Sequence, residues 1–180
     1  MPIPPGTHRL GPDDATLSVR TGRGGAAAKA GHDLTLHVTS WEGTLTLGEG
    51  SAETSVELAA DATSMRVREA TGGVQALGDD DRANIEKTID DEVLRRQDIT
   101  FRSTKAEGDG GTITLTGDLT IVRKTQPITF ELAIGDDGAL AATAVVKQTA
   151  WGMKPYSALF GALKVKDEVQ VVLEGQLPKA

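Results

Sequence analysis

Between Gly111 and Leu177 the chain repeats one pattern three times, with an apolar residue at every second position and turn residues between the runs: GGTITLTGDLTI, PITFELAIGDDG and KDEVQVVLEGQL. Alternation with a period of two places one row of side chains on each face of a strand. These segments therefore predict antiparallel β-structure with one buried face. A long antiparallel sheet has to protect its edges, and closing into a barrel removes them.

Length and charge limit the kinds of protein that this chain can be. The 180 residues predict one domain, which we place at residues 15–178 after an irregular N-terminal segment at 1–14. A net charge of −7 argues against a nucleic-acid partner, since phosphates require a basic face. The chain has no cysteine, which excludes disulfides and thiolate metal sites. No basic and apolar leader opens the chain and no apolar run approaches about 18 residues, so we expect a soluble, cytoplasmic protein without stable membrane insertion.

Two further runs of alternation lie nearer the start of the chain. Residues 34–38 and 44–47 each carry apolar side chains at every second position, and Trp41 with a Glu42-Gly43 turn lies between them. We predict that the two runs form a hairpin.

The apolar spacing changes to that of a helix between residues 80 and 95. Ile85, Ile89 and Val93 are spaced by four, which forms one apolar stripe along a helix. Acidic residues in the first turn and arginines in the last match the helix dipole. We predict one α-helix over about 80–95, packed alongside the sheet. The apolar sequence PYSALFGAL at 155–163 contains a proline and a glycine, and predicts either a short helix or a loop.

The histidines give little support for an enzyme or a metal site. His32 and His37 are five residues apart on one predicted strand, which sends their side chains to opposite faces. His32 and Asp33 would be a local acid–base pair, but the chain has no cysteine and no serine in a G-x-S-x-G sequence. We therefore expect no catalytic residue, no metal and no cofactor. A hydrolase or isomerase that uses His32 is the less favoured alternative.

Several segments in matching order resemble the YceI-like family: GHDLTLHVTSWEGTLTL, ITFRSTK at Ile99–Lys105, GDLTIVRKTQPITFELAI at Gly117–Ile134, VKQTAWGM and VKDEVQVVLEG. The resemblance runs from about Thr16 to Leu177, and its most specific part is G-D-L-T-I followed by a short turn and P-I-T-F. It implies a mainly β fold, an extended eight-stranded antiparallel barrel that is lipocalin-like, with one helix alongside and a polyisoprenoid or quinone in the lumen. Many members of the family are periplasmic or secreted, whereas this chain opens without a signal peptide. The segment GHDLTLHVTSWEG also differs from the common family form, in which small and β-branched residues follow the histidine.

The size of the inward side chains decides whether such a barrel holds a ligand. An eight-stranded barrel is just wide enough to be filled by side chains or to hold one slender molecule. The expected inward rows combine medium and small side chains with few rings, which would leave volume unfilled. We predict non-enzymatic binding, sequestration or transport of a long-chain isoprenoid lipid or quinone. The predicted lining is Leu34, Leu36, Phe101, Ile113, Leu115, Leu119, Ile121 and Phe130, and the predicted gate at the mouth is Trp151, Met153, Leu159 and Phe160.

The main alternative is a solidly packed barrel that acts in a stress response or an interaction without a lipid. It would show the same alternation, because a filled core and a ligand lumen are both lined by apolar residues. The expected partner is a small lipid, with no nucleic acid. A homodimer formed through strands at the barrel ends stays open.

Overall fold

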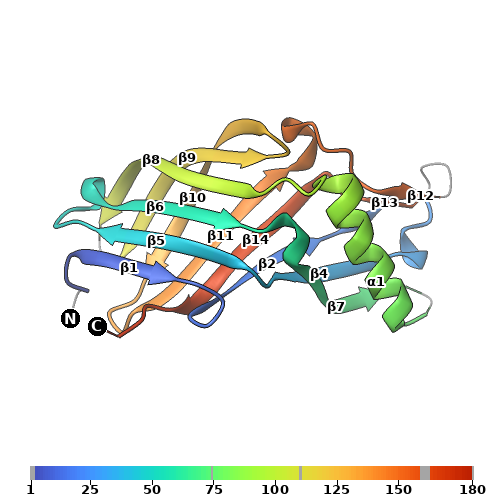
Figure 1. The fold of residues 1–180 in the computed structure, drawn as a ribbon, viewed down its shortest axis with the longest axis horizontal. Coiled ribbons are helices and arrows are strands. Elements are labelled where there is room, and N and C mark those ends of the chain that lie inside the picture. Colours follow the sequence, from blue (N-terminus) through green and yellow to red (C-terminus); the bar gives the residue numbers. More distant parts are fainter. Residues whose placement is uncertain (1–2, 74, 110, 159–162, 180) are drawn as a thin grey trace.

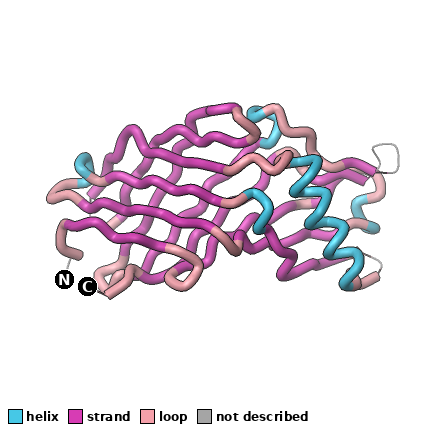
Figure 2. Tube along the Cα trace, viewed as in Figure 1, coloured by secondary structure: helices cyan, strands magenta, loops and turns pink. Residues whose placement is uncertain are grey.

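The computed structural model of this chain describes residues 3–73, 75–109, 111–158 and 163–179. It shows one large curled antiparallel sheet, a small sheet at one end and one helix beside that end (Figures 1 and 2). In pairing order, the large sheet contains β1 (Gly6–Leu10), β5 (Trp41–Leu47), β6 (Ser55–Ala60), β8 (Ile99–Asp109), β9 (Thr112–Ile121), β10 (Lys124–Ile134), β11 (Ala139–Lys147), β14 (Glu168–Gln176), β2 (Ala15–Thr21), β4 (His32–Val38) and β7 (Met65–Gly72).

The small sheet pairs β12 (Ser157–Ala158) with β13 (Leu163–Val165), and β13 with β3 (Arg23–Gly24). Short 3₁₀ turns complete the structure at η1 (Ala28–Ala30), η2 (Ser51–Glu53), η3 (Ala62–Ser64) and η5 (Gln148–Trp151). The small sheet and the helix lie at the end of the barrel away from both termini (Figure 1).

The large sheet closes on itself through the chain. The strands β4 and β5 stand near opposite ends of the pairing order, yet only Thr39 and Ser40 separate them. Across this break the Thr39 N–H donates to the Ser64 carbonyl and the Asp61 N–H donates to the Ser40 carbonyl, both over 3.0 Å. The two halves of this strand therefore link the two ends of the sheet, and the chain between β1 and β2 and between β6 and β7 links them as well.

The expected number of strands, eight, is lower than the eleven observed. Three runs of the wall are interrupted, between β1 and β2, β4 and β5, and β6 and β7. Each interruption is a local bend that removes a few residues from the ladder while the chain continues along the wall. Counting each interrupted run once leaves eight, and the expected class of fold, a lipocalin-like antiparallel barrel with one helix, is confirmed.

The hairpin predicted from residues 34–47 is wrong. The strands β4 and β5 do not pair with each other but follow one another, and Gly43 lies inside β5 opposite Leu58 rather than in a turn. The chain bends at Ser40 because the backbone N–H of this residue bonds to the Ser64 hydroxyl, 3.1 Å away. The hairpin that forms is longer than the predicted one. Its first arm consists of β4 and β5, and its second arm consists of β6, which pairs with β5, and β7, which pairs with β4.

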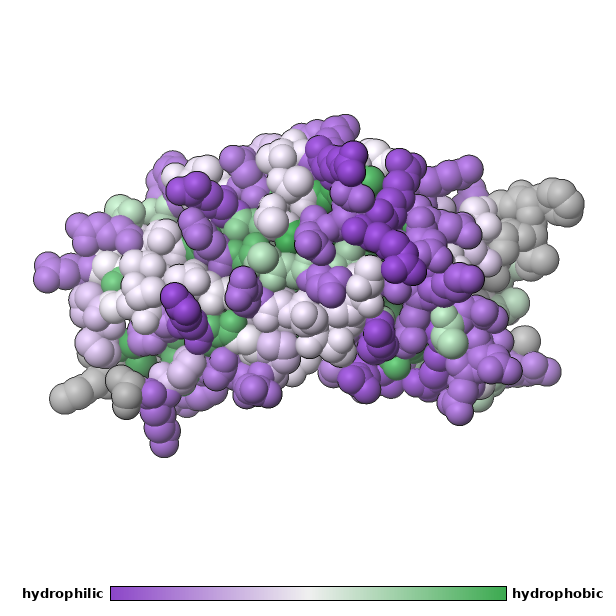
Figure 3. All heavy atoms as spheres, in the orientation of Figure 1, coloured by the Kyte–Doolittle hydropathy of each residue, from purple (hydrophilic) through white to green (hydrophobic). Residues whose placement is uncertain are grey.

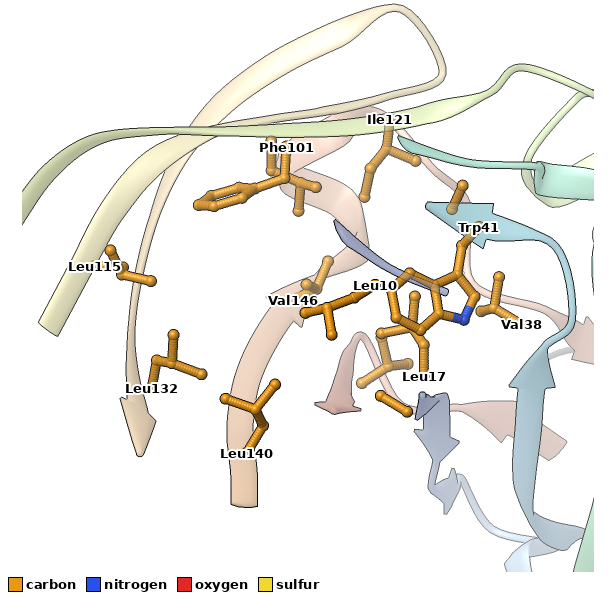
Figure 4. Packing of buried hydrophobic residues seen from close by; sticks show 14 of the residues in the cluster. Leu10, Leu17, Val38, Trp41, Phe101, Leu115, Ile121, Leu132, Leu140 and Val146 are labelled. Atoms are coloured by element: carbon orange, nitrogen blue, oxygen red, sulfur yellow. The ribbon is translucent and has the colours of Figure 1, made fainter. Parts of the chain in front are cut away.

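The inward rows of β9 and β10 lie as the alternation predicted. In β9 the buried positions are Ile113, Leu115, Gly117, Leu119 and Ile121, and the residues between them are more exposed. Leu115 and Ile121 of this row project into an interior that they share with side chains of other strands, such as Phe101, Leu132 and Leu140 (Figure 4). On the outer face that Figure 3 shows, hydrophilic side chains cover most of the surface.

Gly117 leaves room for an aromatic ring inside the barrel. A Cβ built on Gly117 would lie 2.5 Å from the ring of Phe101 and 2.5 Å from the Arg102 carbonyl oxygen. The Phe101 ring therefore lies directly over this glycine, and it also meets the Phe130 ring with centroids 5.4 Å apart. The glycine of the G-D-L-T-I segment is thus explained by close packing on β9.

The predicted helix is present, but it changes pitch before its end. It begins at α1 (Asp79–Thr88), where the Gly78 N–H donates to the Asp81 carboxylate over 3.0 Å, and continues as a π-helical turn, η4 (Ile89–Val93). The left-handed backbone of Arg95 and Arg96, with φ of 52° and 55°, ends it. Glu86 fixes the helix to the barrel by accepting a hydrogen bond of 3.0 Å from the Val67 N–H on β7. The helix therefore covers the outer edge of β7.

Two other segments differ from the expectation. The N-terminal segment, expected to be irregular, contains β1, which pairs with β5 from Gly6 opposite Leu47 to Leu10 opposite Gly43. Prolines and glycines surround this strand of five residues, so its alternation is too short to be recognised in the sequence. In the segment 155–163, expected as a short helix or loop, the described ends form β12 and β13, and residues 159–162 lie outside the described part.

Candidate ligand cavity in the barrel

A cavity of about 520 Å³ lies inside the barrel. This volume falls in the range of about 300–1,000 Å³ that is typical of small-molecule sites. Its walls come from β2, β4 to β6, β8 to β11 and β14, and α1 with η4 covers one side of it. Aliphatic and aromatic side chains form most of the lining, as expected for a site that takes an apolar ligand.

Many inward side chains keep exposed surface although they point away from solvent. Leu34, Leu58, Ile128, Phe130 and Val171 all border the cavity and are only partly buried. In a filled core these side chains would interlock with those of the opposite wall and lose almost all exposed area. The middle of the barrel is therefore open rather than packed.

The structure brings most of the predicted lining residues to this cavity. Ile113 belongs to the same buried row of β9 but does not border the cavity. The residues that do border it are Leu34, Leu36, Phe101, Leu115, Leu119, Ile121 and Phe130.

Of the residues predicted to gate the mouth, the structure describes Trp151 and Met153, and these two differ in position. Met153 borders the cavity, whereas Trp151 is buried outside the lining and donates through Nε1 to the Leu119 carbonyl of β9 over 2.8 Å. This bond fixes the indole against the wall. Leu159 and Phe160 lie outside the described residues.

Sequence reasoning missed the contribution of the helix. Ile85, Ile89 and Val93 border the cavity, and Asn84 and Thr88 add two polar groups beside them. Their spacing by four was visible in the sequence, but it predicted packing against the outside of a sheet. Because these side chains face open space, the helix is part of the cavity wall.

The end of the cavity beside the small sheet carries polar side chains. Arg23 borders the cavity, and its Nη1 donates to the Gly31 carbonyl over 2.8 Å. Its backbone N–H donates to the Asp33 carboxylate over 2.9 Å, and its Nε lies 3.8 Å from the same oxygen. His32 also borders the cavity, with Nε2 2.7 Å from the Gln75 carbonyl oxygen.

These contacts separate the two members of the suggested acid–base pair. Asp33 is held by Arg23, while the ring of His32 is held by the backbone of Gln75. Adjacent residues on a strand point to opposite faces, so the pair does not meet. Within the described parts of the chain, no three histidine, aspartate or glutamate side chains form a group that could hold a metal ion.

Two carboxyl groups with shifted pKa values lie at the junction of β7 and the helix. Burial raises the pKa of Asp90 in η4, and its Oδ1 has no hydrogen-bond partner among the described residues. The hydroxyl and the N–H of Thr63, at 2.7 and 2.8 Å, lower the pKa of Asp61 at the start of η3. Neither carboxyl group borders the cavity, so both act on the stability of the junction.

No helix in the described parts of the chain combines the length and the apolar character that crossing a membrane would require.

Comparison with known proteins agrees with this architecture. A family model described as a YceI-like domain matches residues 13–177. The fold is similar to that of BcnA from Burkholderia cenocepacia, with a TM-score of 0.64 and 16% identity over 89% of this chain and 94% of that chain. It is also similar to the YceI protein of Campylobacter jejuni, with a TM-score of 0.54 and 16% identity over 81% and 85% of the two chains.

A cysteine variant of the Campylobacter protein, crystallised with monobromobimane as a guest, gives a TM-score of 0.59 and 14% identity over 81% of this chain and 85% of that chain. At these identities the likeness shows the fold alone. No curated protein matches the sequence.

Proposed function

This chain belongs to the YceI-like family, whose fold is known for binding polyisoprenoids, and from that membership and the cavity we propose that it binds and carries a long-chain isoprenoid lipid or quinone in its lumen. The binding involves no chemical conversion. The predicted lining residues that border the cavity form its walls, and α1 with η4 covers one side.

One observation carries the proposal: the inward side chains of the barrel are only partly buried around an open volume of about 520 Å³. An apolar chain that enters this space removes its own surface and that of the walls from water. Each buried methylene group contributes roughly 0.8 kcal/mol, so a chain of many carbons is held without a dedicated polar site. The same observation argues against the alternative of a solidly packed barrel.

Extraction of the purified protein with organic solvent, followed by mass spectrometry, tests the proposal directly. We expect a co-purified lipid with an isoprenoid tail. A titration of delipidated protein with geranylgeraniol, followed by the fluorescence of Trp41 in the cavity wall, gives the affinity. If no lipid co-purifies and added isoprenoids do not bind, the proposal is wrong.

A His32→Ala variant distinguishes a carrier from an enzyme. The contacts of His32 and Asp33 give no support to the hydrolase or isomerase alternative, because each side chain is held by a different group. A carrier should bind geranylgeraniol as tightly with alanine at this position. Turnover of a bound ester or isoprenoid that disappears in the variant would instead favour the enzyme. The cytoplasmic location and the homodimer both stay predictions.

A further inference from the structure

A buried glutamine borders the apolar cavity. Four polar side chains are buried in the described parts of the chain, Ser18, Thr54, Ser64 and Gln148, and of these Gln148 alone borders the cavity. Gln148 is only 6% exposed. A carboxamide that is removed from water loses free energy unless its donors and its acceptor find partners, so each of its polar atoms needs an explanation.

The strand before Gln148 points this residue into the cavity. In β11 the inward residues Leu140, Ala142, Ala144 and Val146 border the cavity, whereas the exposed residues between them do not. Gln148 is the next residue of this row, at the start of η5, and it borders the cavity as well. The inward row therefore ends in a polar group, and from Val146 back to Leu140 it covers about 20 Å of strand.

The backbone and the amide of Gln148 are held by the chain around them. Its N–H donates to the Asp167 carbonyl over 2.9 Å, and its carbonyl accepts from the Met153 N–H over 3.1 Å. The side-chain Nε2 donates to the Lys166 carbonyl over 3.1 Å. The Lys166 N–H in turn donates to the Gly22 carbonyl over 2.8 Å, directly before β3. Gln148 is therefore fixed at the end of the cavity beside the small sheet.

The bond to Lys166 decides how the amide is oriented. A backbone carbonyl can only accept, so the amino group has to face Lys166 and Oε1 has to point away from it. Oε1 accepts no hydrogen bond from any residue that the structure describes, and it is not enclosed by protein as the unpartnered Nε1 of Trp41 is. Because Gln148 borders the cavity, this oxygen is an acceptor that a ligand can reach.

We propose that Gln148 binds the head group of the ligand and that this head group is an uncharged hydroxyl, as in a prenol or a quinol. The inference rests on the proposed function and adds the class of head group to it. A hydroxyl donates to Oε1 and accepts from the second N–H of the amide, so it satisfies both groups. A quinone carbonyl or a methyl ether only accepts, which leaves Oε1 without a partner. The apolar tail then lies along the inward row of β11 toward Leu140.

The test compares two ligands that share a tail and differ in the O–H group. Delipidated protein is titrated with geranylgeraniol and with geranylgeranyl methyl ether, which keeps the oxygen but cannot donate. We expect the alcohol to bind about three- to tenfold more tightly than the ether, which is the range that one net hydrogen bond allows. This comparison uses the wild-type protein, so it does not depend on the folding of a variant.

Gln148→Met should remove the preference for the alcohol, because methionine has a similar length but no amide. The ratio of the two affinities is the decisive quantity. If Gln148 only supported the fold, its loss would weaken both ligands alike and leave the ratio unchanged. If it binds the hydroxyl, the ratio falls by about three- to tenfold while the affinity for the ether changes little.

Gln126→Met is the matched control. Gln126 on β10 also donates through Nε2 to a backbone carbonyl, that of Ala150, over 3.2 Å, and it is partly buried but does not border the cavity. This variant should keep the wild-type preference for the alcohol. Urea unfolding of both variants measures what the loss of each structural hydrogen bond does to stability.

An alcohol that binds the wild type no better than the ether would overturn this inference and leave the proposed function standing; a water molecule that stays on Oε1 would give that result. A Gln148→Met variant that keeps the preference would overturn it too. If neither the alcohol nor the ether binds, the proposed function itself fails.

Discussion

Ala142→Phe should block the lumen without unfolding the barrel. Ala142 lies on β11, borders the cavity and is only partly buried, whereas its neighbour Ala141 is exposed on the outer face. A phenyl ring at position 142 takes the place of about three to four methylene groups of a bound chain, and at roughly 0.8 kcal/mol for each the ligand loses about 2–3 kcal/mol. The dissociation constant for geranylgeraniol should therefore rise by about 30- to 150-fold.

The same substitution tests whether the lumen is open. In a filled core an added ring costs about 1–3 kcal/mol, but in open space it buries apolar area without a clash. We expect the free energy of unfolding of the ligand-free variant, measured in urea, to equal or exceed that of the wild type. Ala141→Phe is the control and should leave binding unchanged. A variant at position 142 that is destabilised by 1–3 kcal/mol and still binds the ligand normally would refute the open lumen.

Four other substitutions test the packing of the wall and the charges at the junction of β7 and the helix. Gly117→Ala should cost about 1–3 kcal/mol of unfolding free energy, because the new methyl group would displace the Phe101 ring; a neutral effect in urea would contradict this packing. Trp151→Phe removes a donor to β9 and should cost about 1–3 kcal/mol, with affinity for geranylgeraniol unchanged; weaker binding would place the indole in the site after all. Asp61→Asn should lower the free energy of unfolding at pH 7, because hydrogen bonds lower the pKa of this carboxyl group in the fold, and the deficit should shrink as the pH falls below 3.8. Asp90→Asn should raise the free energy of unfolding at pH 7, because burial raises the pKa of that carboxyl group, and the gain should disappear in acid. Urea unfolding between pH 2 and 8 measures both effects. If the stability differences between variant and wild type change with pH in the same direction for both residues, one of the two pKa directions is wrong.

The parts of the fold that depend on local pattern were predictable. In β9 the alternation from Ile113 to Ile121 fixed which side chains face inward, because a strand has only two faces. The helix was predictable for the same reason, from one apolar stripe and a charged residue pattern at each end. Each signal is complete within one element of the sequence.

The bend between β4 and β5 was not predictable, because its cause lies elsewhere in the chain. A Glu-Gly dipeptide between two alternating runs is compatible with a turn or with a continuous strand. The contacts from Ser64 to Thr39 and Ser40, some 24 residues away in sequence, decide for the strand. Sequence pattern carries no information about such a contact.

The end of the cavity beside the small sheet could not be predicted from local sequence either. The strands of the small sheet there, β3, β12 and β13, are two or three residues long, which is too short for a repeated alternation to be recognised. Arg23 stands in a glycine-rich segment and Val165 follows an apolar one, and nothing in either sequence shows that the two stand opposite each other. The cavity itself exists only where all of these distant pieces come together.

The pairing of β14 with β2 determines when the wall of the barrel is complete. The Ser18 hydroxyl donates to the Val172 carbonyl across 154 positions of sequence, and Arg20 stands opposite Gln170. During synthesis β2 can pair early with β4 along one edge, but its other edge stays unpaired until β14 has been made. Until β14 docks, the wall has a gap between β11 and β2, so we expect the proposed lipid to be held only by the completed barrel.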